Sequence, residues 1–153
     1  MTKSGSTKTL YVDGTAQANG TDTSTAWGFG SNVQIGRGAW PDGAAGYLDG
    51  DLDDHRVWSR ALSASEISSL YSAGREDSRT LTTGLVGHWT FDNADATADV
   101  GADGTNNGAT FETVDSRTVA SLASGDYIHI DNAGANFTTE DFSAAFWFYN
   151  EGS

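Results

Sequence analysis

Short apolar runs, each bounded by residues that favour turns, recur from one end of the chain to the other. Val, Ile, Leu and aromatic residues fill the runs, and Gly, Asn, Asp, Ser and Thr fill the spaces between them. This pattern is typical of many short strands joined by turns, and it predicts an all-β sandwich. The predicted strands are Thr9–Val12, Asn32–Ile35, Leu52–Trp58, Leu85–Phe91, Ala109–Phe111, Thr118–Leu122, Asp126–Ile130 and Phe142–Tyr149.

Alternation along residues 126–130 separates two kinds of side chain. Tyr127 and His129 fall on one side of this strand, and Ile128 and Ile130 fall on the other. Because successive side chains of a strand point to opposite faces, we expect one face in the core and one wetter face. Three tryptophans in predicted strands are also expected in the core: Trp58, Trp89 and Trp147.

A single helix is predicted over residues 62–74. Ser63 and Glu66 have the spacing of a capping box, and Gly74 is placed to end the helix. The apolar stripe that would face the sandwich consists of Ile67, Leu70 and Tyr71. The polar stretch 75–83 is interpreted as a connector between two halves, residues 1–74 and 84–153.

Acidic residues greatly outnumber basic ones and are spread along the whole chain. There are 21 Asp and Glu against 8 Lys and Arg, which gives a formal net charge of −13. Binding a phosphate backbone requires clustered Lys and Arg, so we expect no nucleic-acid partner, and the charge also opposes anionic lipid. Dispersed carboxylates favour adaptation to concentrated salt, as in a halophilic, haloarchaeal protein, with stability that rises with salt.

The length and the residue types limit the number of domains and the kinds of bonds, sites and targeting segments that the chain can contain. A chain of 153 residues suits one domain, residues 1–153, and the absence of cysteine excludes disulfides and thiolate metal sites. The first residues lack the apolar segment of a signal peptide, and no apolar run has the length of a membrane span. We therefore expect no membrane insertion and no export signal in the chain as given.

Motifs in the first half resemble the end of a laminin G-like, or concanavalin A-like, jelly-roll domain. They are Leu10–Gly14 (LYVDG), the Ile35-Gly36 step, Tyr47–Gly50 (YLDG), Leu52–Trp58 (LDDHRVW) and Arg60–Ile67 (RALSASEI). The resemblance implies a two-sheet antiparallel sandwich, concanavalin A-like, with one short helix.

Motifs in the second half resemble the beginning of the same kind of domain. They are Gly84–Asp92 (GLVGHWTFD), the turn region 99–108, Asp126–Ile130 and Phe142–Trp147. The family's ending thus precedes its beginning. Three interpretations remain open: a circular permutant, which we favour, a span excised from a tandem array, or an exchange of halves between copies. Strands missing from the middle would leave open sheet edges, so a homo-oligomer is expected under the first and third.

The family's fold is shared by binding modules and by glycosidases. A glycosidase needs two carboxylates that face each other across a groove, but the five glutamates here are isolated from one another, and the dense acidic run 49–54 contains only Asp. No cysteine or strained serine motif suggests a nucleophile either. We therefore expect no enzyme, with a glycoside hydrolase as the weaker alternative.

Carbohydrate recognition requires an aromatic platform beside polar groups on exposed loops. Trp27 and Trp40 lie among glycines, which suggests loops, and Arg37, Asn32 and Asp42 are close in sequence. These five residues form the predicted ligand site. The alternative is that each tryptophan packs its own loop onto the sandwich.

By resemblance to the family, Asp53 is the position that would hold one structural Ca²⁺. Asp92 and Asp99 are candidates to complete the ligand shell, since Ca²⁺ prefers oxygen ligands. The alternative is that Asp53 and Asp54 pair with Arg56 or cap turns.

The leading interpretation is a non-catalytic module that binds carbohydrate or a surface glycoprotein, at a cell surface, in the extracellular space or on a virion. The alternative is an architectural subunit of a surface layer, appendage or virion.

Overall fold

The computed structural model describes residues 1–21, 32–39, 45–77, 81–132 and 140–149. Within these ranges the chain forms thirteen strands and one helix. They are β1 (Thr2–Ser4), β2 (Thr7–Val12), β3 (Thr15–Thr21), β4 (Val33–Ile35), β5 (Arg37–Ala39), β6 (Ala45–Tyr47), β7 (Gly50–Trp58), α1 (Ala64–Asp77), β8 (Leu85–Trp89), β9 (Thr105–Asn107), β10 (Thr110–Val114), β11 (Arg117–Leu122), β12 (Tyr127–Ile130) and β13 (Phe142–Tyr149).

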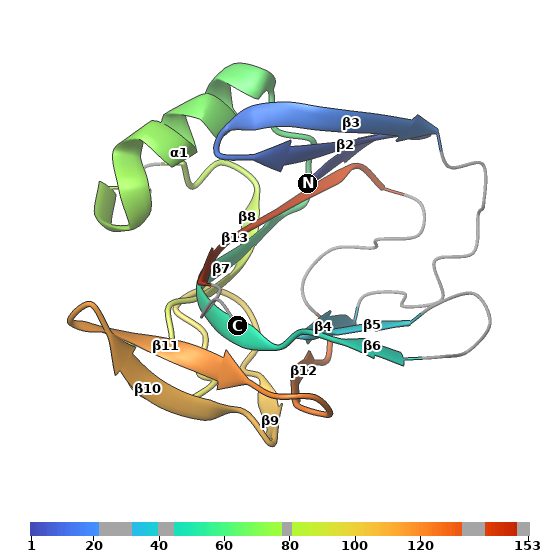
Figure 1. The fold of residues 1–153 in the computed structure, drawn as a ribbon. Helices are drawn as coiled ribbons and strands as arrows, with labels where there is room; N and C mark the ends of the chain where they lie inside the picture. Colours follow the sequence, from blue (N-terminus) through green and yellow to red (C-terminus); the bar gives the residue numbers. More distant parts are fainter. Residues whose placement is uncertain (22–31, 40–44, 78–80, 133–139, 150–153) are drawn as a thin grey trace.

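The largest sheet combines strands from both halves of the chain. Its order is β10-β11-β7-β13-β1-β2-β3, and β8 pairs with the C-terminal part of β7. All the pairings are antiparallel. The strand β7 lies in the middle, with β11 and β8 along one side and β13 along the other (Figure 1). The two halves therefore share one sheet.

A second layer faces this sheet and closes the core. It consists of the three-stranded sheet β4-β12-β9 and the hairpin β5–β6. Ile128 and Ile130 of β12 are fully buried in one cluster with Leu52 and Leu122 of the large sheet. The predicted alternation in this strand is confirmed, because its other two side chains are only half-buried. The predicted antiparallel all-β fold with one short helix is confirmed as well.

Each predicted strand overlaps an observed one, but five strands were not predicted. These are β1, β3, β5, β6 and β9. They are short or rich in Gly and polar residues, such as Arg37–Ala39 and Thr105–Asn107. Such segments carry no apolar alternation of their own, and they are strands because a neighbouring backbone pairs with them.

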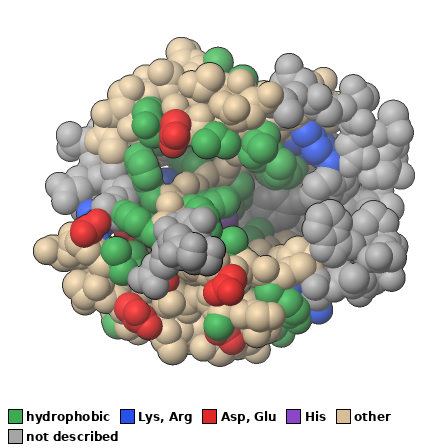
Figure 2. Space-filling model, in the orientation of Figure 1, with side chains coloured by type: hydrophobic (Ala, Val, Ile, Leu, Met, Phe, Trp, Pro, Cys, Tyr) green, Lys and Arg blue, Asp and Glu red, His purple; other side chains and the backbone are tan. Residues whose placement is uncertain are grey.

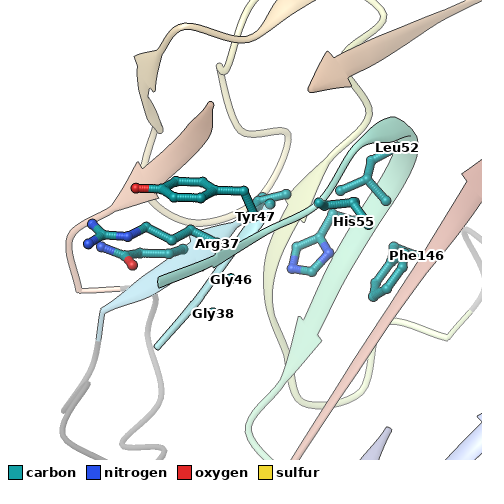
Figure 3. A pocket seen from close by; sticks show the side chains of 11 residues that line it. Arg37, Gly38, Gly46, Tyr47, Leu52, His55 and Phe146 are labelled. Atoms are coloured by element: carbon teal, nitrogen blue, oxygen red, sulfur yellow. The ribbon is translucent and has the colours of Figure 1, made fainter. Parts of the chain in front are cut away.

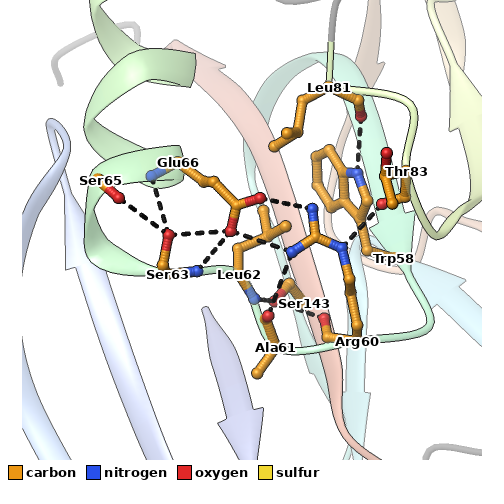
Figure 4. Close-up of polar contacts among 10 residues, drawn as sticks. All are labelled: Trp58, Arg60, Ala61, Leu62, Ser63, Ser65, Glu66, Leu81, Thr83 and Ser143. Atoms are coloured by element: carbon orange, nitrogen blue, oxygen red, sulfur yellow. Dashed lines mark hydrogen bonds and ion pairs between the residues drawn. The ribbon is translucent and has the colours of Figure 1, made fainter.

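The start of α1 contains the predicted capping box (Figure 4). The backbone N–H of Ser63 donates to Glu66 Oε2 at 2.8 Å, and the N–H of Glu66 donates to Ser63 Oγ at 3.3 Å. Arg60 adds two hydrogen bonds to the same carboxylate, at 3.0 and 2.7 Å. The Arg60 bonds first, and then those from Ser63, lower the pKa of Glu66 to about 2. Regular helical geometry is interrupted at Gly74, where φ is 69° and ψ is −173°.

The three strand tryptophans have different environments. Trp58 and Trp89 are fully buried, and each indole N–H donates to a backbone carbonyl, of Leu81 and Ala102 respectively. Trp147 is only half-buried and stacks on Tyr71 of α1, with ring centroids 6.1 Å apart. The expectation that Trp147 lies in the core was therefore wrong, because it lies on the face of the large sheet that α1 covers.

Candidate binding pocket

A bulge in β7 places its polar side chains on both faces of the sheet. Between the pairs Ala145–Arg56 and Trp147–Asp53, β7 places two residues, Asp54 and His55, opposite the single residue Phe146. Asp54 takes up the extra length with a φ of 55°, a left-handed conformation that Asp tolerates better than most residues. We call the face that carries Asp53, Asp54 and Arg56 the outer face, and the face that carries Leu52, His55 and Val57 the inner face.

On the outer face, buried charges are paired with one another. Asp54 Oδ1 lies 2.8 Å from Arg56 Nη2 and 2.6 Å from His88 Nε2. Asp53 Oδ2 accepts a hydrogen bond from Arg117 Nε at 3.0 Å. Burial opposes ionisation of Asp54, but the hydrogen bond with His88 and the charge of Arg56 outweigh it, so its pKa is lowered. The predicted alternative for Asp54, an ion pair with Arg56, is present.

On the inner face, the side chains leave a cavity of about 500 Å³ between the second layer and β7 with β13 (Figure 3). Its described lining residues come from β4, the β5–β6 hairpin, the segment after it, β7 and β13: Gln34, Ile35, Gly36, Arg37, Gly38, Gly46, Tyr47, Leu48, Leu52, His55 and Phe146. We call this cavity the inner pocket.

The β5–β6 hairpin forms the wall of the inner pocket opposite His55, and the side chains of Arg37 and Tyr47 point from it away from His55 and Phe146 (Figure 3). The Arg37 guanidinium lies 5.8 Å from the ring centroid of Tyr47 and 5.1 Å from that of Tyr127. Stacking on aromatic faces holds the guanidinium in place. Gly38 and Gly46 are paired directly opposite each other, so no side chain covers the hairpin backbone there. A Cβ added at Gly38 would meet no atom of the described residues within 4 Å.

His55 lies at the opposite side of the inner pocket. Its side chain is only 7% exposed and lies between the rings of Trp89 and Phe146, at 5.9 and 5.7 Å. No described residue makes a hydrogen bond with its buried Nδ1, and the same holds for Nε of Arg37. Burial lowers the pKa of His55 to about 4, so the imidazole is neutral near neutral pH.

The predicted ligand residues are only partly placed by the structure. Arg37 lines the inner pocket, and Asn32, just before β4, accepts a hydrogen bond from the Asn132 N–H through its side chain at 3.2 Å. Trp27, Trp40 and Asp42 lie outside the described residues. Sequence reasoning missed Tyr47, His55 and Phe146 as pocket residues. Tyr47 and His55 lie within the quoted YLDG and LDDHRVW motifs, so the signal was present, but the face to which each side chain points was not.

The residues predicted to bind Ca²⁺ do not form a ligand set. Asp53 pairs with Arg117, Asp99 accepts a hydrogen bond from Thr90 Oγ1 at 2.8 Å, and Asp92 is exposed. Within the described ranges, no group of three or more His, Asp or Glu side chains is arranged to hold a metal ion. The guanidinium beside Asp53 supplies the positive charge that a cation would, so these three side chains alone do not make a Ca²⁺ site. Calcium binding stays a prediction.

Comparison with protein families bears on the first half of the chain. Residues 1–68 match the family model described as the concanavalin A-like lectin/glucanases superfamily. The resemblance to this superfamily is confirmed over these residues, which include β1–β7 and the start of α1. A search of curated proteins and a search of solved structures each found no match. In the described part of the chain, no helix has the length and apolar character needed to cross a membrane.

Proposed function

We propose that this chain is a non-catalytic module that binds carbohydrate or a surface glycoprotein, with the inner pocket as its ligand site. A concanavalin A-like sandwich fits a carbohydrate-binding or adhesion role, and the superfamily match covers the strands that build most of the pocket. Such a role suits an extracellular surface or a virion.

The composition of the inner pocket is the observation that carries the proposal. Sugar rings bind where an aromatic face lies beside a few fixed polar groups. Phe146 beside His55 is 52% exposed, and Tyr47, beside Arg37 on the other face of the hairpin, is 38% exposed, so both rings are accessible to a ligand that binds in the pocket and at its rim. Arg37 and His55 each offer a nitrogen that lacks a hydrogen-bond partner among the described residues. A polar ligand would satisfy these buried atoms, whose desolvation is otherwise unfavourable.

The pocket's chemistry also supports binding without catalysis. None of the described residues that line it is Asp or Glu, whereas glycoside hydrolysis uses two facing carboxyl groups. The acidic residues Asp53 and Asp54 belong to the outer face, where they pair with cations. Without an acid and a base among the described lining residues, a bound sugar would be held and released unchanged.

A glycan array followed by calorimetry with the strongest hit tests the proposal. We expect Tyr47→Ala to weaken binding at least tenfold, because it removes the aromatic face beside Arg37. Gly38→Val should also block binding, since its Cβ would enter open space beside the hairpin backbone. Trp27→Ala and Trp40→Ala test the two tryptophans predicted from the sequence.

Tyr71→Ala is the matched control, since Tyr71 is similarly exposed but packs against Gly14 and Trp147, outside the pocket lining. The control should bind glycan as the unaltered protein does. Binding that survives both Tyr47→Ala and Gly38→Val would exclude the inner pocket as the ligand site. Release of sugar from a polysaccharide panel would contradict the non-catalytic role.

A further inference from the structure

Arg37 differs from the other arginines whose side chains the structure describes. Each of the others has a carboxylate partner within 3.0 Å: Arg56 with Asp54, Arg60 with Glu66, and Arg117 with Asp53. In the described part of the chain, Arg37 has no carboxylate partner. Acidic residues outnumber basic ones by 21 to 8, so a shortage of acids does not explain this exception. We infer that the charge of Arg37 is available to a ligand.

Two tyrosine rings hold the guanidinium of Arg37. Tyr47 is paired with Arg37 across the hairpin, and its ring centroid lies 5.8 Å from the guanidinium carbon. Tyr127 of β12 lies closer, at 5.1 Å. The Nε of Arg37 is buried, while the guanidinium end points away from His55 and Phe146 (Figure 3). Rings beside the face of a guanidinium leave its edge, with the N–H donors, open to a planar acceptor.

Gln34 adds a neutral polar group to the same lining, and His129 orients it. Gln34 Nε2 lies 3.3 Å from His129 Nδ1, and His129 Nε2 lies 3.0 Å from Asp131 Oδ1. Because an amide N–H only donates, this pattern assigns the imidazole proton to Nε2, which donates to Asp131. The amide oxygen of Gln34 is then free to accept a hydrogen bond from a ligand hydroxyl.

Among the described residues that line the inner pocket, Arg37 carries the only charge near neutral pH. The one other titratable nitrogen base there is His55, which burial keeps neutral. Two acidic side chains flank β12, and both are engaged away from Arg37. Asp131 is bonded to His129, and Asp126 accepts a hydrogen bond from the Ala123 N–H. The local charge of the pocket is therefore positive.

The charge of the whole molecule opposes an anion at longer range. The formal net charge is −13, and Figure 2 shows Asp and Glu side chains scattered over one face, with Lys and Arg in small separate areas. Salt at about 0.1 M screens charges that lie more than about 10 Å apart. A contact between a guanidinium and a carboxylate forms at about 2.7–2.9 Å and is screened much less. In salt, the local attraction at Arg37 therefore dominates.

We propose that Arg37, held by Tyr47 and Tyr127, is a carboxylate subsite, and that the ligand of the inner pocket is a glycan containing uronic acid. This proposal rests on the glycan binding proposed above and names its ligand class. The fork of a guanidinium matches the two oxygens of a carboxylate. A uronic acid also carries ring hydroxyls, which suit Gln34, and an apolar ring face, which suits Phe146.

Pairs of oligosaccharides that differ only in charge test the proposal. Oligomers of galacturonic, glucuronic and mannuronic acid are titrated into the full chain by calorimetry in about 0.15 M NaCl, each beside its methyl ester. The ester has the same rings and hydroxyls but no negative charge. We expect at least one acid to bind more tightly than its ester by about tenfold or more.

The outcomes separate this proposal from the proposed function. Equal binding of every acid and its ester, or binding of neutral or sulfated glycans in preference to every uronic acid, would overturn the carboxylate subsite and leave glycan binding in place. Absence of binding to any glycan would overturn both.

Substitutions of Arg37 locate the subsite. Arg37→Gln should bring the affinity for the acid down to that for its ester. Arg37→Lys keeps the charge but lacks the planar fork, and it should also lower the affinity for the acid, by about tenfold. Lys8→Gln is the matched control, since it removes the same charge from β2, outside the pocket lining. A preference for the acid that survives Arg37→Gln, or that Lys8→Gln abolishes equally, would overturn the proposal.

Tyr127 is a positioning residue, because it is not part of the pocket lining and acts through Arg37. Tyr127→Leu should lower the ratio of acid to ester affinity by about threefold, the size expected for one cation–π contact. Tyr127→Phe keeps the ring and should restore the ratio. A general loss of structure would lower both affinities together, so the ratio distinguishes the two causes. An unchanged ratio in Tyr127→Leu would overturn the role assigned to Tyr127.

Discussion

Asp54 and His55 are neighbours in β7, yet their side chains lie on opposite faces of the sheet and differ in their hydrogen-bond partners. On the outer face, Asp54 is buried within 2.8 Å of Arg56 and 2.6 Å of His88. On the inner face, His55 is nearly as buried, but its Nδ1 has no hydrogen-bond partner among the described residues and it borders an open cavity. The difference is that Asp54 has charged partners on the outer face, whereas His55 lies between the rings of Trp89 and Phe146.

This contrast separates two uses of buried polar groups. A buried charge must be paired, because desolvation without a partner is costly, so the outer face contributes to the stability of the fold. A neutral imidazole without a partner is tolerated more easily, and beside a cavity it can bind a ligand. The comparison predicts that changes on the outer face affect stability and that changes on the inner face affect binding.

The largest effect should come from Asp54→Asn. Asn keeps the shape and tolerates the positive φ, but it leaves Arg56 and His88 without their carboxylate, which should destabilise the fold by about 3–5 kcal/mol. Urea denaturation measures the change. Asp92→Asn, at an exposed position, is the control and should have little effect. A loss below about 1 kcal/mol at Asp54 would mean that the outer-face pairing is not stabilising.

His55 should make stability depend on pH between about 4 and 6.5. The pKa of His55 is about 4 in the folded protein and 6.5 in the unfolded chain, so the unfolded chain binds the proton first as the pH falls. Its stabilising contribution is complete above pH 6.5 and decreases down to about pH 4, by about 3 kcal/mol in total. Urea midpoints across this range measure the change. His55→Leu should flatten this part of the profile, and an unchanged slope would contradict the burial argument.

A smaller effect is expected at the helix cap, which resembles the outer face in its pairing but is exposed to water. Ser63→Ala removes one half of the capping box and should cost about 1 kcal/mol in the free energy of unfolding. Ser69→Ala, at an exposed position later in the same helix, is the control. If Ser63→Ala lowered the free energy of unfolding as much as Asp54→Asn does, burial would not explain the expected difference between the two sites.

The smallest change in stability should follow Tyr47→Ala. Tyr47 is 38% exposed, so its removal should change the free energy of unfolding by no more than about 0.5 kcal/mol while glycan binding is lost. Thermal melting beside the glycan titration separates the two readouts. A drop in stability comparable to that of Asp54→Asn would assign Tyr47 to the core and remove it from the ligand site.

The elements with their own local signals were predicted correctly. The capping box at Ser63 and Glu66 and the alternation of 126–130 are both present, because each depends on residues close in sequence. The candidate site was predicted less well. Arg37 was placed in the ligand set and lines the inner pocket, whereas the pocket roles of Tyr47 and Phe146 were missed because they arise from strands distant in sequence.

The sequence alone determined the antiparallel all-β class, the helix and its cap, and the acidic character, because these follow from local periodicity, capping and composition. Only the tertiary structure decided which face of β7 each polar residue occupies, since a single extra residue in the bulge at Asp54 reverses the alternation beyond it. It also decided that Arg117, 64 positions away, is the partner of Asp53. Such pairings depend on strand order and register, which are properties of the folded sheet and cannot be read from any local stretch of the chain.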